Sequence, residues 1–92
     1  MATLTREELL EKVKTALGIT GDYQNGTLSI YIDEVKEYMI SAGVSKNVVD
    51  SSLSIGVITR GVSDLWNYGS GNTGFSPYFM QRVIQLVYEK EG

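Results

Sequence analysis

The chain has 92 residues, of which 42% are hydrophobic and 21% are charged, a balance typical of one globular domain with a modest core. It contains no Cys and no His, which excludes disulfides and thiolate metal sites and removes the commonest general base and zinc ligand. The net charge of −3 disfavours sequence-independent nucleic-acid binding, and no apolar run approaches the roughly 20 residues that span a bilayer. We therefore expect a protein without catalytic residues, cofactor or metal. The first residues lack a signal-peptide pattern, so we expect it to be made and used in a cytoplasm.

The first predicted helix covers the stretch LTREELLEKVKTALG, residues 4–18. Thr5 is a good N-cap, and Glu8 three residues later completes a capping box. Apolar residues then recur at helical spacing, and Gly18 supplies a stop.

The second predicted helix begins between Asp22 and Thr27 and ends at Gly43. Its apolar residues are spaced by three and four positions and predict one buried stripe: Leu28, Tyr31, Ile32, Val35, Tyr38, Met39 and Ala42. Its opposite face is charged and carries Asp33, Glu34, Lys36 and Glu37. We expect that face to be solvated; the alternative is that its three carboxylates meet a basic surface of a partner.

The middle of the chain has less certain local structure. Ser45 can cap a short helical turn over residues 46–50. The following segment SSLSIGVITRGVSDLWNYG, residues 51–69, contains β-branched residues together with Gly56 and Gly61, all of them poor helix formers. Its apolar spacing nevertheless favours a helix. The two glycines either let another backbone approach closely or are simply tolerated.

The last predicted helix begins at Ser76, an N-cap, with Pro77 in the first helical position. Its apolar residues recur helically as Phe79, Met80, Val83, Ile84, Val87 and Tyr88, although the tail RVIQLVY alternatively fits a short strand. The sequence therefore predicts an all-α fold: a small bundle of about four helices with a flexible Gly-rich loop before the last helix. Residues 1–92 are expected to form a single domain.

The loop NYGSGNTGFSP, residues 67–77, contains the pattern G-x-G-x-x-G at Gly69, Gly71 and Gly74. A dinucleotide site needs a strand before this pattern and a helix directly after it, and the chain is too short for the second strand. No Gly-Lys-Ser/Thr follows, so the pattern does not fit a Walker loop either. We expect a flexible loop, with a mobile contact arm as the alternative.

Aromatic residues at the edges of loops are the candidate contact residues, because Tyr and Trp concentrate at protein interfaces. We expect Trp66 in the core, as an anchor of the third helix. The candidates for a partner-facing loop are Tyr68, Asn72, Phe75 and Tyr78. Simple packing of the loop is the alternative.

Two charged pairs have helical spacing. Asp33 and Glu37 lie four residues apart, but a solvated face explains them better than a cation site. Arg60 and Asp64, also four apart, are expected to form a surface ion pair worth less than about 1 kcal/mol.

Two runs carry a family resemblance: VSDLWN, residues 62–67, and FSPYFMQRVIQL, residues 75–86. With the helices before them, the chain resembles the tailed-phage head–tail connectors, the small gp6-like adaptor proteins of phages and of prophages in Gram-positive bacteria. This resemblance covers nearly the whole chain.

The resemblance implies a non-enzymatic virion protein, assembled in the cytoplasm of the host bacterium. Members are all-helical and form homo-oligomeric rings beneath the portal protein. They join it to a tail-completion or stopper protein and help retain the packaged DNA, which passes through the ring without specific binding. No membrane partner is implied. The alternative is a small helical DNA-packaging accessory or nucleic-acid-associated module, which the acidic charge and the long glycine-rich gap disfavour.

Overall fold

The computed structural model describes residues 4–68 and 75–88, which contain five α-helices and one short 3-10 helix. In chain order these are α1 (Arg6–Leu17), α2 (Asn25–Ser41), α3 (Lys46–Val49), η1 (Ser52–Ser54), α4 (Ile55–Tyr68) and α5 (Pro77–Val87). No β-strand occurs among the described residues. The predicted all-α fold is confirmed, and the number of helices is higher than the expected four because the short turn after Ser45 forms α3.

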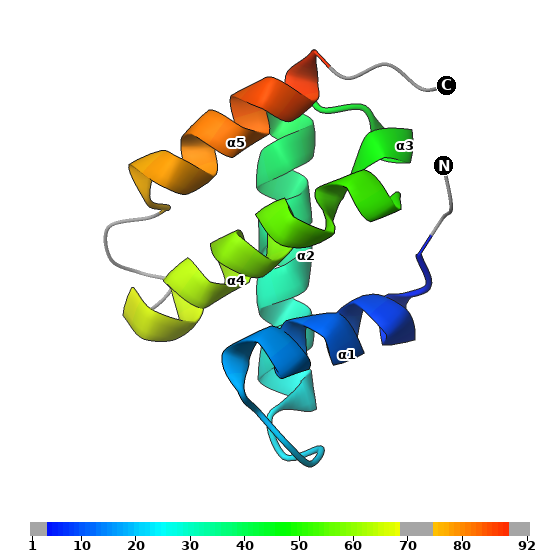
Figure 1. Cartoon of the computed structure of the whole chain (residues 1–92), viewed down its shortest axis with the longest axis vertical. Helices are drawn as coiled ribbons and strands as arrows, with labels where there is room; N and C mark the ends of the chain where they lie inside the picture. Colours follow the sequence, from blue (N-terminus) through cyan, green and yellow to red (C-terminus); the bar gives the residue numbers. More distant parts are fainter. Residues whose placement is uncertain (1–3, 69–74, 89–92) are drawn as a thin grey trace.

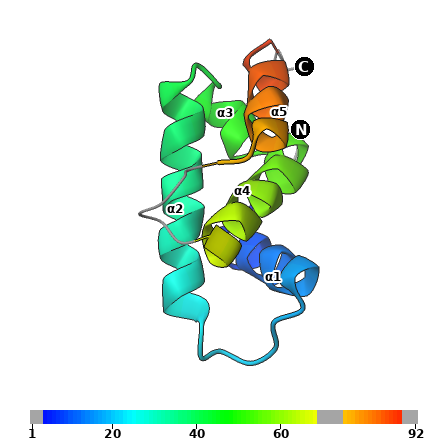
Figure 2. The same ribbon diagram turned by 90° about the vertical axis from the view of Figure 1, so that its left-hand side faces the viewer.

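The helices form two layers (Figures 1 and 2). The long helix α2 makes one layer, and α1, α4 and α5 cross it one after another in the second layer. The middle helix of that row, α4, packs against α1, α2 and α5. The molecule is flat, with Cα extents of 36 × 29 × 17 Å, so α2 forms one broad face and the row of shorter helices forms the other.

The predicted helix ends of α1 are confirmed by their hydrogen bonds. The Glu8 backbone N–H donates to Thr5 Oγ1 at 3.1 Å, and the Thr5 backbone N–H donates to Glu8 Oε1 at 2.9 Å. The backbone hydrogen bond from Thr5 holds the pKa of the Glu8 carboxyl below its ordinary value. At the other end, Gly18 has φ +73°, a conformation that glycine adopts without strain.

The start of α5 also follows the prediction. The Phe79 backbone N–H donates to Ser76 Oγ at 3.2 Å, and Pro77 is the first helical residue. The helix continues to Val87, so the alternative of a short strand over this tail is wrong. The ambiguous segment from 51 onward forms η1 and α4, as its apolar spacing predicted.

One hydrophobic cluster joins all five α-helices. Its members include Leu9, Val13, Leu28, Ile32, Val35, Met39, Val48, Val57, Ile58, Val62, Phe79 and Val83, each at most 1% exposed. Gly61 lies where α4 packs closest to its neighbours. A Cβ built there would stand 2.6 Å from Phe79 Cε1 and 2.9 Å from Val35 Cγ2. The atoms that approach Gly61 belong to side chains of α2 and α5 and not to another backbone, so the space beside it is filled by Phe79 and Val35. A Cβ on Gly56 would meet nothing within 4 Å, which agrees with simple tolerance of that glycine.

Candidate partner interface

The four candidate contact residues do not form one described surface. Asn72 and the glycines of the G-x-G-x-x-G pattern lie outside the described residues. Tyr68 is the last residue of α4, and its side chain is likewise outside the described part. Phe75 and Tyr78 are described, and they face in different directions.

Phe75 faces the core. It is half-buried, and its ring centroid lies 5.0 Å from that of Tyr38 and 4.4 Å from that of Phe79. Aromatic pairs at such separations stabilise the contact beyond their buried area. Phe75 therefore holds the beginning of α5 against α2 and presents little surface to a partner.

Tyr78 faces solvent and is flanked by two arginines. Its side chain is 51% exposed, and the guanidinium carbons of Arg60 and Arg82 lie 5.2 and 6.0 Å from its ring centroid. Arg82 Nη1 also donates a hydrogen bond to Tyr78 Oη at 3.1 Å. Arg82 has no carboxylate partner among the described residues. These three residues, here named the Tyr78 cluster, make an aromatic, positively charged surface suited to a carboxylate-bearing partner.

Arg60 and Asp64 do form an ion pair, but the prediction that it lies on the surface is wrong for Asp64. The Asp64 side chain is only 4% exposed, and Arg60 Nε lies 3.6 Å from its carboxylate. The other carboxylate oxygen accepts the backbone N–H of Ser76 at 3.0 Å. This hydrogen bond joins Asp64 on α4 to Ser76, the N-cap residue of α5. Asp64 follows buried Gly61 by three residues and therefore lies on the buried side of α4. This spacing could have indicated from the sequence that Asp64 is buried.

Trp66 packs at the edge of the core. It is half-buried and meets Tyr31 edge-on, with ring centroids 6.4 Å apart and planes at 80°. Tyr31 and Tyr38 are also half-buried and pack against the same core. Tyr31 and Tyr38 thus lie on the side of α2 that packs against the core, as their helical spacing predicted, and Trp66 meets Tyr31 from α4.

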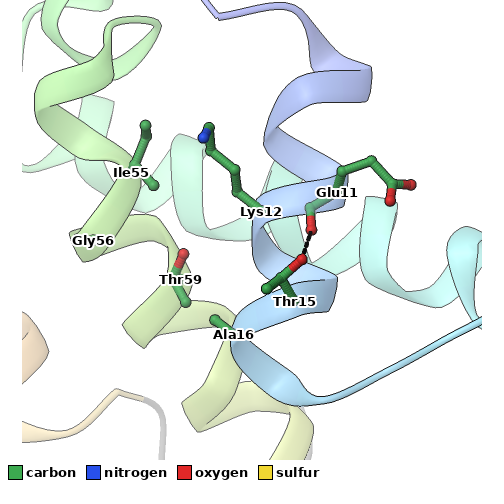
Figure 3. A pocket seen from close by; sticks show the side chains of 7 residues that line it. All are labelled: Glu11, Lys12, Thr15, Ala16, Ile55, Gly56 and Thr59. Carbon is green, nitrogen blue, oxygen red and sulfur yellow. Dashed lines mark hydrogen bonds between the residues drawn. The ribbon is translucent and has the colours of Figure 1, made fainter.

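A groove separates α1 from the first turns of α4 (Figure 3). It has a volume of about 570 Å³, and its mostly apolar lining comes from Glu11, Lys12, Thr15, Ala16, Ile55, Gly56 and Thr59. Thr15 Oγ1 donates to the Glu11 backbone oxygen at 2.9 Å, so its hydroxyl is already satisfied and its methyl group remains for packing. The helices that form this α1–α4 groove and those that carry the Tyr78 cluster, α4 and α5, belong to the same layer.

A row of apolar side chains remains uncovered on α5. Met80, Ile84 and Tyr88 follow at intervals of four residues and are exposed, whereas Phe79, Val83 and Leu86 form the buried side of the helix. The sequence showed the helical recurrence of these residues but not which of them would face solvent. The helix that carries this α5 stripe lies at one end of the molecule, at the top of Figure 1.

The outward face of α2 combines acidic and apolar residues. Ile30 is 65% exposed, and Glu34 and Glu37 follow it by four and seven residues on the same side of the helix. Neither glutamate makes an ion pair with another described residue. Asp33 differs, because Arg6 Nη2 donates to its carboxylate at 2.7 Å.

Residues 4–68 and 75–88 contain neither a metal-binding cluster of acidic residues nor a membrane-spanning helix. In that part of the chain, no three acidic side chains come together in a way that could hold a metal ion. None of the helices described is both long and apolar enough to cross a membrane.

The described residues therefore present several surfaces for contact. In comparisons with known proteins, the family described as phage gp6-like head-tail connector protein matches residues 7–90. No curated protein and no solved structure matches the chain significantly.

Proposed function

The chain belongs to the phage gp6-like head–tail connector family, and from this premise we propose that it forms a homo-oligomeric ring beneath the portal protein. The ring joins the portal to a tail-completion or stopper protein and helps retain the packaged DNA. The observation that carries this proposal is the family match over residues 7–90, nearly the whole chain. A phage structural connector is a component of the virion, and this one is assembled in the cytoplasm of the host bacterium.

The distribution of exposed side chains supports self-association. A head-to-tail ring uses two different surfaces of each subunit. The α1–α4 groove and the Tyr78 cluster lie on one broad face, and the α2 outer face lies on the other. The α5 stripe lies at an edge between them and is available for a protein above or below the ring.

The chemistry of the chain supports a role through shape and contact. The chain has no His and no Cys, so the usual proton-transferring and thiolate groups are missing. Its net charge of −3 suits a wall past which DNA slides, because phosphate binding requires a basic excess. Residues 1–92 act together as one connector domain.

Sedimentation velocity and native mass spectrometry test the proposal. The protein is measured over a wide concentration range, with and without purified portal rings. We expect species far larger than the 10.1 kDa subunit, and their formation to be promoted by the portal. A chain that stays monomeric at every concentration, even with the portal present, contradicts the proposal. A DNA shift that persists at moderate salt would instead favour the nucleic-acid-associated alternative.

A further inference from the structure

We propose that neighbouring subunits in the ring stack face to back, with the α2 outer face of one copy on the α1–α4 groove and Tyr78 cluster of the next. This inference rests on the proposed ring, and it names the two surfaces that make the ring contact. The α2 outer face consists of Ile30, Glu34 and Glu37.

The charges of the two faces are complementary. Glu34 and Glu37 have no ion-pair partner within the described part of their own subunit, and Arg82 on the opposite broad face has none either. Arg60 is half-exposed beside the Tyr78 ring and has only the buried carboxylate of Asp64 as partner. Face-to-back stacking brings the unpaired carboxylates of one copy to the guanidinium groups of the next, where planar two-point hydrogen bonding is favoured.

The order of groups along the long axis of the molecule also matches. From the lower to the upper end of α2 in Figure 1, the exposed face carries apolar Ile30, then Glu34, then Glu37. Seven residues separate the first from the last, a rise of about 10 Å along the helix. In the same direction the other layer presents α1, then α4, then α5, so the apolar groove between α1 and α4 comes before α5, the helix that carries Arg82. Stacking two copies with their α2 helices pointing the same way therefore brings Ile30 toward the groove and the glutamates toward the arginines.

The groove can accept a side chain from a neighbour at its α4 wall. Gly56 there presents no side chain, and a Cβ at this position would meet nothing within 4 Å. Ala16 and Ile55 add apolar surface on either side. Covering a largely exposed Ile side chain in this groove favours association, because it removes apolar surface from water.

The shape of the subunit favours the same pair of faces. A stable interface buries about 800 Å² on each partner. From the Cα extents, each broad face outlines roughly 1000 Å², whereas the narrow sides outline roughly 500–600 Å², so the broad faces come closest to what an interface requires. Because the two broad faces differ, the contact is head-to-tail, and a constant rotation between successive copies closes such a stack into a ring when the rotations add up to a full turn.

Engineered cysteines test this contact directly, since the chain has no natural Cys. Ile30→Cys and Gly56→Cys are prepared as separate variants, mixed, assembled with portal rings and mildly oxidised. We expect a disulfide-linked dimer in the mixture and not in either variant alone, because a disulfide requires Cα atoms within about 7 Å. Ile84→Cys on the α5 stripe replaces Ile30→Cys as the matched control and is expected to give no dimer with Gly56→Cys.

The outcomes separate this inference from the proposed function. If Ile30→Cys links to itself, or if large assemblies form but the mixture gives no cross-link, the face-to-back contact is wrong and the ring stands. If the unmodified protein forms no large assembly even with the portal, the ring and the contact fail together.

Charge reversal gives a second measurement of the same contact. Glu37 and Arg82 lie on the surface, so reversing either charge leaves the core intact. We expect Glu37→Arg and Arg82→Glu each to weaken assembly at least tenfold, and the double variant to recover most of the loss. Two single variants that assemble as the parent does would overturn the pairing of the two faces.

Discussion

Replacing Gly61 with alanine tests how closely α4 packs against its neighbours. The added Cβ would stand 2.6 Å from Phe79 Cε1 and 2.9 and 3.0 Å from the two Val35 methyl carbons. Both neighbouring side chains are completely buried, and the Phe79 ring is itself in contact with the rings of Phe75 and Tyr38. Neither can move aside without displacing further core residues.

The expected cost follows from two opposing effects. Overpacking a filled core costs about 1–3 kcal/mol, and the higher helix propensity of alanine returns up to about 1 kcal/mol. Because two buried side chains must shift at once, we place the packing cost near its upper end. Gly61→Ala should therefore lower the free energy of unfolding by about 2 kcal/mol, which corresponds to a decrease in Tm of roughly 10 °C for a domain of this size.

The assay is thermal and urea unfolding followed by circular dichroism at 222 nm, at protein concentrations low enough to keep the subunit dissociated. Gly26→Ala is the matched control, because Gly26 is exposed in the first turn of α2 and a Cβ there meets nothing within 4 Å. We expect the control to be unchanged or slightly more stable. If Gly61→Ala matches or exceeds the parent in stability, the close packing of α4 against Phe79 and Val35 is refuted.

Three further changes test individual contacts. Asp64→Ala leaves the Ser76 backbone N–H without its acceptor and should lower the free energy of unfolding, measured in urea, by about 1–3 kcal/mol. Asp64→Asn keeps an acceptor oxygen and should lower it less. Equal losses in the two variants would contradict the role of this hydrogen bond. The hydrogen bond from Lys46 holds the pKa of the Asp50 carboxyl below its ordinary value of 3.8. The ionised Asp50 carboxylate therefore stabilises the folded protein above pH 3.8, and this stabilisation is lost as the pH falls through the lowered pKa. Acid titration of Asp50→Asn should therefore show a flatter loss of stability below that pH than the parent, and an unchanged titration curve would refute the assignment. Trp66→Ala should lower the free energy of unfolding, measured by thermal unfolding, by about 2 kcal/mol. This is less than the roughly 3–5 kcal/mol lost on removing a fully buried aromatic side chain, because the Trp66 ring is only half-buried. A negligible loss would show that the packing of Trp66 contributes nothing to stability.

Prediction from sequence worked best for the ends of helices. A capping box, a Ser-Pro helix start and a terminal glycine act through hydrogen bonds and backbone angles within a few residues of one another. The same holds for the apolar stripe of α2 from Leu28 to Met39, because helical spacing alone decides which residues share a face. The prediction was wrong for Ala42, which is exposed because α2 ends at Ser41. That the candidate contact residues meet a partner stays a prediction. Being aromatic and near a loop does not distinguish Phe75, which packs inward, from exposed Tyr78.

The sequence by itself therefore determined the helical class, the local boundaries of α1 and α5, and the absence of His and Cys chemistry. Only the tertiary structure decided that Asp64 is buried under the start of α5 and that Gly61 must remain without a side chain. It alone placed an acidic face and a basic cluster on opposite sides of a flat subunit. The physical reason is that burial and charge placement depend on which distant segments lie against a residue, and neighbours in the sequence do not specify those segments.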